Sequence, residues 1–322
     1  MKIFKRTLLM TVILSLLLFL SISVSCNNDS GELSTEAESS EETTELTDDL
    51  MYMGQNRPGL IPEVFAPGII SIGGQSESNI TFTPDGKEIY YVAGTDQRSM
   101  IMTSRLENGE WTEPESASFS QEYSNWGPFV SPDGQKLYFT SNRPPEDSSS
   151  RSDPNIWVVR RTEDGSWSSP EILPEPVNSE SWDGIPSVYQ DGTLVFISDR
   201  DGAPDANIYK SDLSDEGYVE VEKFPEPVNT TYPDIGPILT IDMQYLIFAS
   251  MRPGASGEDI YISARNEDSS WSEPRNLGEP INTPGPEYAP RLSLDNEFLF
   301  YCSNDDLYWV DSPSKRSDKT GN

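Results

Sequence analysis

Histidine is absent from this chain of 322 residues. Its absence excludes Ser-His-Asp and Cys-His catalysis, histidine-ligated zinc and imidazole acid–base chemistry. Cysteine is scarce, with only Cys26 and Cys302. Cys302 stands in an apolar run, so we expect an inert buried thiol there and no disulfide. Any chemistry must therefore depend on carboxylates, Tyr, Lys or an oxygen-ligated cation.

Positive charge is also scarce. The chain has 22 Lys and Arg against 54 Asp and Glu, which gives a formal net charge of −32. Such an acidic chain is unsuited to binding nucleic acid or an anionic membrane surface. We interpret most of this charge as a solvated acidic surface.

The first 26 residues resemble a bacterial lipoprotein signal. Basic residues at positions 2, 5 and 6 precede an apolar run over residues 8–20, and small residues lead into Cys26. The apolar run is short for a membrane-spanning helix. The resemblance implies that Cys26 is the lipidated first residue of the mature chain. Ser23 stands where this signal usually has Leu, which leaves ordinary signal-peptidase cleavage as the alternative.

The next segment has the composition of a tether. Residues 27–50 contain nine acidic residues, no basic ones and many Ser and Thr. Such a stretch buries too little apolar surface to offset its ordering entropy. We expect a disordered acidic tether over residues 27–58, a folded domain over 59–311 and a disordered tail over 312–322.

One phrase recurs five times in the folded domain. A turn sequence such as Thr-Pro-Asp-Gly or Ser-Pro-Asp-Gly precedes a short apolar run such as Leu-Tyr-Phe. The turn aspartates are spaced by about fifty residues, at Asp85, Asp133, Asp191, Asp242 and Asp295. A period of this length with strand–turn–strand content is typical of a β-propeller blade. We expect these aspartates to be turn residues and not ligands.

Each repeat divides into four strands, and the fifth repeat lacks its fourth. The missing strand has a match at the front of the domain, where residues 62–67 (Pro-Glu-Val-Phe-Ala-Pro) parallel residues 170–176 (Pro-Glu-Ile-Leu-Pro-Glu-Pro). We therefore predict an all-β, five-bladed β-propeller of four-stranded antiparallel blades. Its last blade is closed by an N-terminal outer strand that places Val64 and Phe65 beside Tyr308 and Trp309.

The repeat pattern also resembles a known family. Pro-Asp-Gly, Leu-Tyr-Phe, Ser-Asn-Arg or Ser-Asp-Arg, and Asn-Ile-Trp follow one another as in TolB-type, WD-repeat-like propellers of bacterial envelope proteins. The Glu-Pro-Val-Asn phrases are similar to those of envelope lipoproteins. The resemblance implies an envelope location and a binding or assembly role. TolB itself is six-bladed with an extra amino-terminal domain, and neither is found in the pattern of this chain.

A candidate site follows from the repeat frame. Eight positions before each turn aspartate, four of the five residues are acidic, and aromatic residues stand beside them. These positions begin the innermost strands, at the mouth of the central channel, where they could hold a cation, a basic peptide end or a sugar. The candidate ligand-binding residues are Glu77, Asn125, Trp126, Trp182, Asp183, Tyr232, Asp234, Glu287 and Tyr288.

A structural role competes with this interpretation. The acids could instead pair with Arg143, Arg200 and Arg252 of the Ser-x-Arg turns, as architectural ion pairs. No nucleophile–base pair can be assembled from the sequence.

We therefore predict a lipid-anchored, non-catalytic recognition propeller of the bacterial envelope, at the outer membrane, that binds a protein, peptide or glycan and is monomeric. The alternative is a carboxylate-based glycoside hydrolase of the five-bladed type, in which the mouth acids supply an acid and an ionised partner. We expect no cofactor, with a structural Ca²⁺ in the channel as a further possibility.

Overall fold

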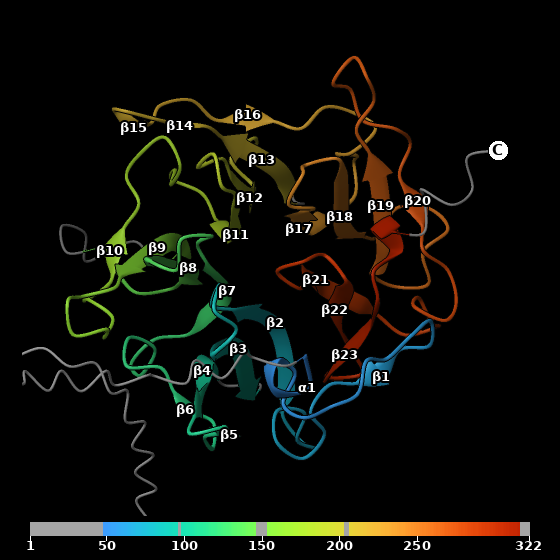
Figure 1. The fold of residues 1–322 in the computed structure, drawn as a ribbon. Helices are drawn as coiled ribbons and strands as arrows, with labels where there is room; N and C mark the ends of the chain where they lie inside the picture. The colour runs from blue at the N-terminus through green and yellow to red at the C-terminus, as the bar shows by residue number, and fades with distance from the viewer. Residues whose placement is uncertain (1–47, 96–97, 146–152, 203–205, 316–322) are drawn as a thin grey trace, which may run out of the picture. The chain divides into compact units, whose positions relative to one another are not determined.

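The protein folds as a five-bladed β-propeller. A computed structural model describes residues 48–95, 98–145, 153–202 and 206–315. Within these residues, five small antiparallel sheets surround a central axis (Figure 1). The predicted fold class is confirmed.

The blades are numbered 1 to 5 in the chain order of their innermost strands, and the strands of each blade follow one another from the axis to the rim. The innermost strands are β2 (Ser76–Phe82), β7 (Asn125–Val130), β11 (Asp183–Val188), β17 (Asp234–Leu239) and β21 (Glu287–Leu292). The second strands are β3 (Glu88–Thr95), β8 (Lys136–Ser141), β12 (Leu194–Ser198), β18 (Tyr245–Ser250) and β22 (Phe298–Ser303). The third strands are β4 (Arg98–Glu107), β9 (Asn155–Arg160), β13 (Asn207–Ser211), β19 (Asp259–Ala264) and β23 (Asp306–Asp311).

The outer strands are short. They are β6 (Glu115–Ser116), β10 (Glu171–Ile172), β16 (Glu222–Lys223), β20 (Arg275–Asn276) and β1 (Glu63–Val64). Two further hairpins lie at the rim, formed by β5 (Glu110–Trp111) with β4, and by β14 (Leu213–Ser214) with β15 (Gly217–Tyr218). Short outer strands limit the exposed backbone edge that could pair with another chain.

The ring closes through β1, as the sequence predicts. Val64 pairs with Tyr308 and Glu63 with Trp309 in an antiparallel register. Phe65 is fully buried, and its ring centroid lies 5.2 Å from those of Phe300 and Trp309. The N-terminal strand therefore completes blade 5 and brings the two ends of the domain together.

The Asp-Gly phrase forms the hairpin between the first and second strands. Asp85 accepts hydrogen bonds from the Thr83 hydroxyl and the Lys87 backbone N–H. Gly86 has a φ of 67°, a conformation that favours glycine. Equivalent side-chain hydrogen bonds to the backbone form at Asp133, Asp191, Asp242 and Asp295. These aspartates are turn residues, as expected.

Every innermost strand has a bulge two residues after its candidate site position. The register shifts in all five strands. Positive φ angles occur there at Asn79, Gly127, Ile185, Gly236 and Ala289. A bulge bends a strand sharply, so the same local irregularity is repeated around the axis.

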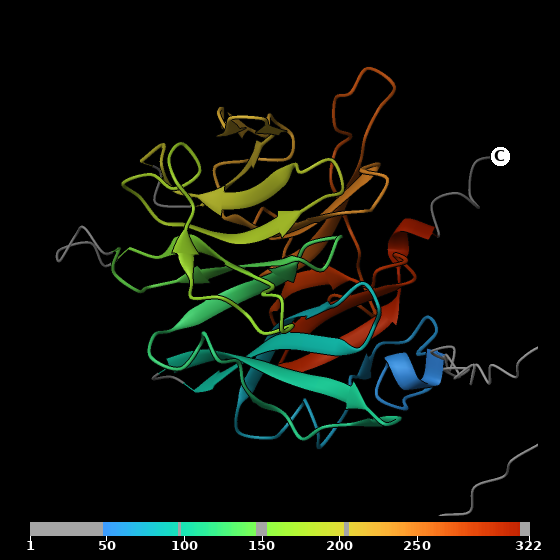
Figure 2. The same cartoon turned by 60° about the vertical axis from the view of Figure 1, so that its left-hand side comes forward.

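The ordered domain begins earlier than expected. We assigned residues 48–58 to the tether, yet they begin with the short helix α1 (Asp48–Met51) and pack on blade 5. The helix is drawn in blue in Figures 1 and 2. Tyr52 is only 2% exposed and lies in an aromatic cluster with Phe298 and Trp309. Met51 and Met53 pack on the same cluster, so this short segment buries apolar surface that holds it on the domain.

The other end also differs from expectation. Ser312 and Ser314, assigned to the tail, are buried, and Lys315 forms an ion pair with Glu297. The predicted signal (residues 1–26), the lipidation site Cys26 and residues 27–47 of the predicted tether lie outside the described residues.

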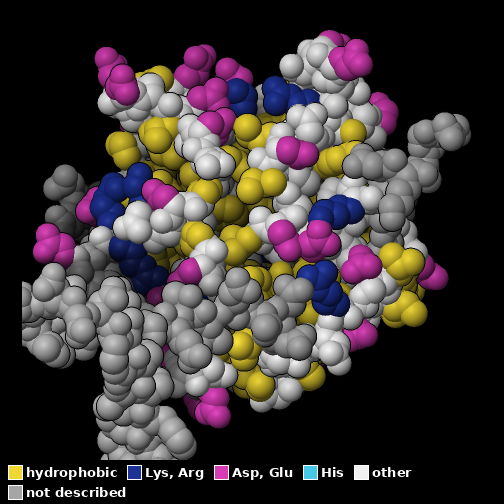
Figure 3. Space-filling model, viewed as in Figure 1, with side chains coloured by type: hydrophobic (Ala, Val, Ile, Leu, Met, Phe, Trp, Pro, Cys, Tyr) yellow, Lys and Arg dark blue, Asp and Glu magenta, His cyan; other side chains and the backbone are white. Residues whose placement is uncertain are grey.

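The surface agrees with the acidic composition. In the space-filling view, Asp and Glu side chains lie around the periphery of the face shown, while hydrophobic side chains gather around its centre (Figure 3). The described part of the chain contains no helix long and apolar enough to cross a membrane.

Candidate functional site

The five candidate positions come together at one end of the central axis. Each occupies the first or second residue of an innermost strand, and these strands surround the axis (Figure 1). The side chains are nevertheless almost completely buried: Glu77 is 1% exposed and the other four are 0% exposed, namely Asn125, Asp183, Asp234 and Glu287. The repeats therefore place these residues correctly at the starts of the innermost strands, but their side chains are buried in the protein.

In blades 3 and 4 an arginine neutralises the buried aspartate. Arg200 Nη2 lies 2.6 Å from Asp183, and Arg252 Nη2 lies 2.6 Å from Asp234. Each guanidinium also donates to backbone carbonyls of the loop that enters from the preceding blade. In blade 2, Arg143 Nη2 donates to the Asn125 side chain at 3.0 Å. The arginine therefore ties its own blade to the loop before it, and we call this arrangement the arginine latch.

A second set of hydrogen bonds holds the same acids. Ser179 donates to Asp183 through both its backbone N–H (2.6 Å) and its hydroxyl (2.8 Å). Thr230 does the same to Asp234, at 2.7 and 2.8 Å. Because a buried carboxylate is stable only when paired and hydrogen-bonded, these contacts explain how two aspartates remain in the protein interior.

The Glu-Pro-Val-Asn phrase supplies the preceding anchor. Asn178 accepts from the Ile156 backbone N–H and donates to the carbonyls of Ile156 and Leu173. Asn229 makes the same three contacts in the next blade. The asparagine fixes the loop, and the Ser or Thr after it then meets the acid. This function of the phrase is not evident from sequence, because the asparagine's partners lie about twenty residues away.

In the described residues, the mouth acids of blades 5 and 1, Glu287 and Glu77, have no arginine latch. Asp305 follows β22 at the position that arginine takes in blades 2–4. Glu287 is held instead by the Thr283 N–H and hydroxyl and by the Ser303 hydroxyl. Glu77 receives one long hydrogen bond, 3.4 Å from the Ile72 N–H, and its Oε2 has no partner in the described residues.

Glu77 is consequently perturbed. Burial raises its pKa to about 7, and the nearby carboxylates of Asp306 and Asp305 act in the same direction. A cavity of about 330 Å³ lies at the seam between blades 5 and 1, lined in part by Asp305, Asp306 and Ser76. A carboxyl that titrates near neutrality is the one feature of the mouth suited to proton transfer.

The aromatic residues of the candidate site remain accessible to different extents. Tyr232 is 42% exposed, whereas Trp126, Trp182 and Tyr288 are half-buried. In the sequence each lies one or two residues from a mouth position. The structure thus leaves aromatic surface accessible at the mouth while it buries the acids.

Two further groups complete the description of the centre. Burial raises the pKa of the Cys302 thiol to about 12, which agrees with an inert thiol. Arg291 on β21 is 1% exposed, and its Nε and Nη2 have no partner in the described residues. Burial lowers the pKa of Arg291 to about 10. Sequence reasoning missed Arg291, because the equivalent positions in other blades carry uncharged residues. Among the described residues no group of three or more Cys, Asp or Glu is placed to hold a metal ion.

Comparisons with known proteins identify similar propellers. No family model matches the sequence, and no curated protein sequence matches it. Among solved structures, TolB from Acinetobacter baumannii is 18% identical, with a TM-score of 0.47 over 74% of this chain and 54% of that chain. This chain therefore spans about half the length of that protein.

Two other similar structures differ in kind. A putative TolB from Agrobacterium tumefaciens is 16% identical, with a TM-score of 0.46 over 71% of this chain and 70% of that chain. A thermostable family-43 glycoside hydrolase is 13% identical, with a TM-score of 0.48 over 74% of this chain and 89% of that chain. Likenesses this distant carry no argument about activity, which must come from the site itself.

Proposed function

We propose that this protein is a non-catalytic recognition propeller, anchored by a lipid to the bacterial cell envelope, that binds a protein, peptide or glycan. One observation carries the proposal: three of the four acids at the mouth, Asp183, Asp234 and Glu287, are buried in structural contacts. Asp183 and Asp234 are fully buried and ion-paired. A carboxylate in that state cannot reach a substrate, so the surface left for binding is aromatic.

The mouth aromatics suit recognition. Aromatic rings contribute large apolar area at low conformational cost and stack on sugars or pack on peptide side chains. The absence of histidine and the buried acids leave few groups for catalysis. The envelope location and the lipid anchor rest on the lipoprotein-like signal and on the acidic segment after Cys26.

The test is affinity capture from envelope extracts of the source cells with three forms of the protein. We expect wild type to retain a discrete partner that the Tyr232→Ala variant loses. Tyr232 is 42% exposed, so its removal leaves the core intact. The matched control is Ile241→Ala, since Ile241 is 59% exposed and lies in a hairpin turn at the other end of the blades. A partner retained equally by all three forms contradicts binding at the mouth.

A glycoside hydrolase remains the second candidate because of Glu77. Its raised pKa, about 7, is that of a general acid. Hydrolysis also needs an ionised carboxylate across the scissile bond, and Asp305 and Asp306 are the acids whose charge reaches Glu77. A screen of oligosaccharides against wild type and Glu77→Gln decides the question. Hydrolysis that is lost in the variant overturns the non-catalytic proposal.

A further inference from the structure

A second pocket lies at the opposite end of the blades from the mouth. It occupies the boundary between blades 3 and 4, has a volume of about 520 Å³ and includes the hairpin residue Asp191. Val195, Phe224, Leu239 and Trp271 supply much of its apolar wall. Volumes of this size are common for small-molecule sites.

The repeat identifies the same place between blades 1 and 2. In the rim hairpins of blades 2 and 4, Trp167 forms an isolated β-bridge with Arg161, and Trp271 forms one with Arg265. On the facing blades, Tyr90 in β3 and Val195 in β12 pair with equivalent residues of their innermost strands, Thr81 and Ser187.

The same alignment extends two residues back along each second strand. Glu88 of blade 1 therefore corresponds to Thr193 of blade 3. The two boundaries can be compared residue by residue.

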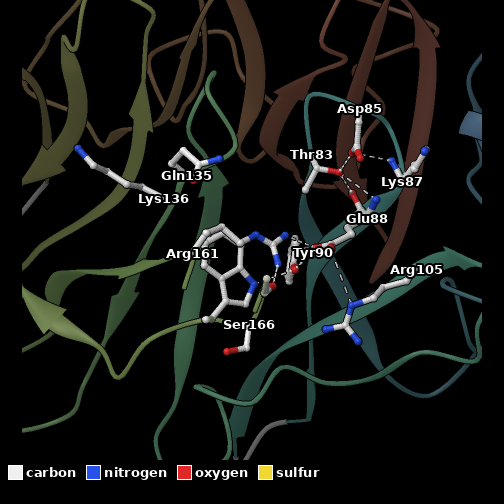
Figure 4. Close-up of polar contacts among 12 residues, drawn as sticks. Thr83, Asp85, Lys87, Glu88, Tyr90, Arg105, Gln135, Lys136, Arg161 and Ser166 are labelled. Carbon is white, nitrogen blue, oxygen red and sulfur yellow. Dashed lines mark hydrogen bonds and ion pairs between the residues drawn. The ribbon is translucent and has the colours of Figure 1, made fainter. Parts of the chain in front are cut away.

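Between blades 1 and 2 this place is filled by the protein itself. The Trp167 indole N–H donates to the Tyr90 hydroxyl at 2.8 Å. Arg161 lies over the Trp167 ring at 3.9 Å from its centroid and forms an ion pair with Glu88. Figure 4 shows Tyr90, Glu88 and Arg161 converging at this boundary. The Tyr90 phenol thus accepts the hydrogen bond of the tryptophan, and the Glu88 carboxylate pairs with the arginine.

Between blades 3 and 4 both of these groups are missing. Val195 has no ring and Thr193 has no carboxylate. The Thr193 hydroxyl donates to Asp212. In the part of the chain that the structure describes, no hydrogen bond is found for the Trp271 indole N–H and no ion pair for the exposed Arg265. The pocket therefore retains the tryptophan and the arginine and lacks what they bind elsewhere.

The other two aromatic positions of this kind are also filled. The Trp111 indole N–H donates to the Leu50 carbonyl at 2.6 Å, so the N-terminal segment covers it. Tyr218 in blade 3 packs with Tyr138 and donates to the Gly192 carbonyl at 3.2 Å. Trp271 alone among these four described positions faces a pocket with its polar atom unused.

Three acids, Asp191, Asp212 and Glu222, line the pocket together with three cations, Lys210, Lys223 and Arg265. Lys210 is paired with Asp212 and Glu222, and Lys223 is paired with Asp201. Arg265 is then the cation left to meet an anion, while the apolar wall beside Trp271 suits a ring. Arginine binds carboxylate through two parallel hydrogen bonds, which gives it orientation as well as charge.

We propose that this pocket binds a small aromatic ligand that carries a hydroxyl group on its ring and a carboxylate. The ring packs against Trp271, the hydroxyl oxygen on the ring accepts the indole N–H, and the carboxylate pairs with Arg265. The ligand takes the place that Tyr90 and Glu88 occupy between blades 1 and 2. This site is separate from the mouth, so the inference does not depend on the proposed function.

The Tyr90 hydroxyl donates to the Glu88 carboxylate, so the two groups to be replaced are adjacent. The test therefore uses as probe 2-hydroxybenzoate, whose hydroxyl and carboxylate are also adjacent, titrated into the full chain by calorimetry. We expect saturable binding with a Kd of about 1 mM or lower, in the range available to so small a ligand. Loss of the hydroxyl (benzoate) or of the carboxylate (phenol) is expected to weaken binding by about fivefold or more. Absence of saturable binding of the probe overturns the proposal.

Two variants locate the site. Val195→Tyr restores the residue of blade 1 and is expected to abolish probe binding by filling the pocket. Arg265→Gln, on the surface, keeps the fold and is expected to weaken binding of the probe by about fivefold or more, with little change for phenol. Arg275→Gln on β20, an exposed arginine outside the pocket, is the matched control. Probe binding that Arg265→Gln leaves unchanged contradicts the assignment, even if Val195→Tyr fails to fold.

Discussion

Blades 2–4 and the seam between blades 5 and 1 solve the same problem with different chemistry. In blades 3 and 4 a buried aspartate meets an arginine at 2.6 Å, and in blade 2 the arginine meets an asparagine at 3.0 Å. Glu77, at the seam, and Glu287, which meets the loop from blade 4, have no arginine, and Asp305 stands at the arginine position of blade 5. The seam is held instead by a cluster of aromatic rings.

The aromatic cluster brings together segments that are distant in the chain. Tyr52 and Phe65, near the start of the domain, pack on Phe298, Phe300 and Trp309 near its end. Apolar packing is non-directional, so it closes a ring whose ends must find each other without a fixed loop between them. The polar latch works where a short loop already delivers its partners. The comparison indicates that the acids of the repeat are primarily structural.

The largest effect is expected from Phe65→Ala at the seam. Removing a fully buried ring leaves a cavity beside Trp309 and should lower the free energy of unfolding by about 3–5 kcal/mol. Urea denaturation measures the loss. Ile61→Ala is the control, since Ile61 is 72% exposed and its truncation should change stability by about 0.5 kcal/mol or less. Equal effects of the two variants contradict closure by packing.

Asp234→Ala tests the latch and should rank next. The substitution leaves Arg252 with a buried charge and no counter-charge, at a cost of about 3–4 kcal/mol in unfolding free energy. Thermal and urea unfolding both report it. Glu267→Ala, an exposed acid in a hairpin turn, is the control with almost no effect. A loss below about 1 kcal/mol for Asp234→Ala shows that the latch is not structural.

Glu77→Gln should act in the opposite direction. The folded-state pKa of Glu77, about 7, is above its ordinary value of 4.5, so the folded protein binds the proton more tightly. Stability therefore falls as pH rises from about 4.5 to 7, and the variant escapes this loss. We expect Glu77→Gln to be more stable than wild type by roughly 2–3 kcal/mol at pH 8 and unchanged near pH 4.

Unfolding curves for wild type and Glu77→Gln at a series of pH values provide the measurement. A variant that is destabilised at pH 8 indicates that Glu77 has a favourable partner in its ionised form. That result removes the distinction between the seam and the latched blades.

The smallest effect is expected at the rim. Arg160 and Glu171 lie 3.2 Å apart, but their side chains are 47% and 57% exposed. Exposed pairs are screened by water and salt, so Glu171→Ala should change the unfolding free energy by about 0.5 kcal/mol or less. Parallel denaturation of Glu171→Ala and Asp234→Ala separates burial from charge pairing as the source of stability. A loss above about 2 kcal/mol for Glu171→Ala contradicts this ranking.

The sequence predicts the architecture well because propeller blades repeat. The number of turn aspartates predicts the number of blades, and the extra strand near Val64 predicts the ring closure with Tyr308. The same frame places Glu77, Asp183 and their equivalents at the starts of the innermost strands. Each of these predictions follows from local patterns that are compared between copies.

Features that depend on contacts between distant residues were missed. Residues 48–58 were assigned to the tether, and the packing of Met51, Tyr52 and Met53 on the core becomes clear only from the structure. The burial of Arg291 and the pocket beside Trp271 depend on which residues face each other across blades. Val195 makes that pocket because it is smaller than Tyr90, and this equivalence becomes clear only from the strand registers.

A double-mutant cycle on Asp183 and Arg200 tests the structural role of the mouth acids most directly. The unfolding free energies of wild type, Asp183→Ala, Arg200→Ala and the double variant are measured in urea. The latch predicts a coupling energy of about 2 kcal/mol or more, because the two groups lie 2.6 Å apart and Asp183 is fully buried. A coupling energy within about 0.5 kcal/mol of zero contradicts the latch and returns Asp183 to the set of residues available for ligands.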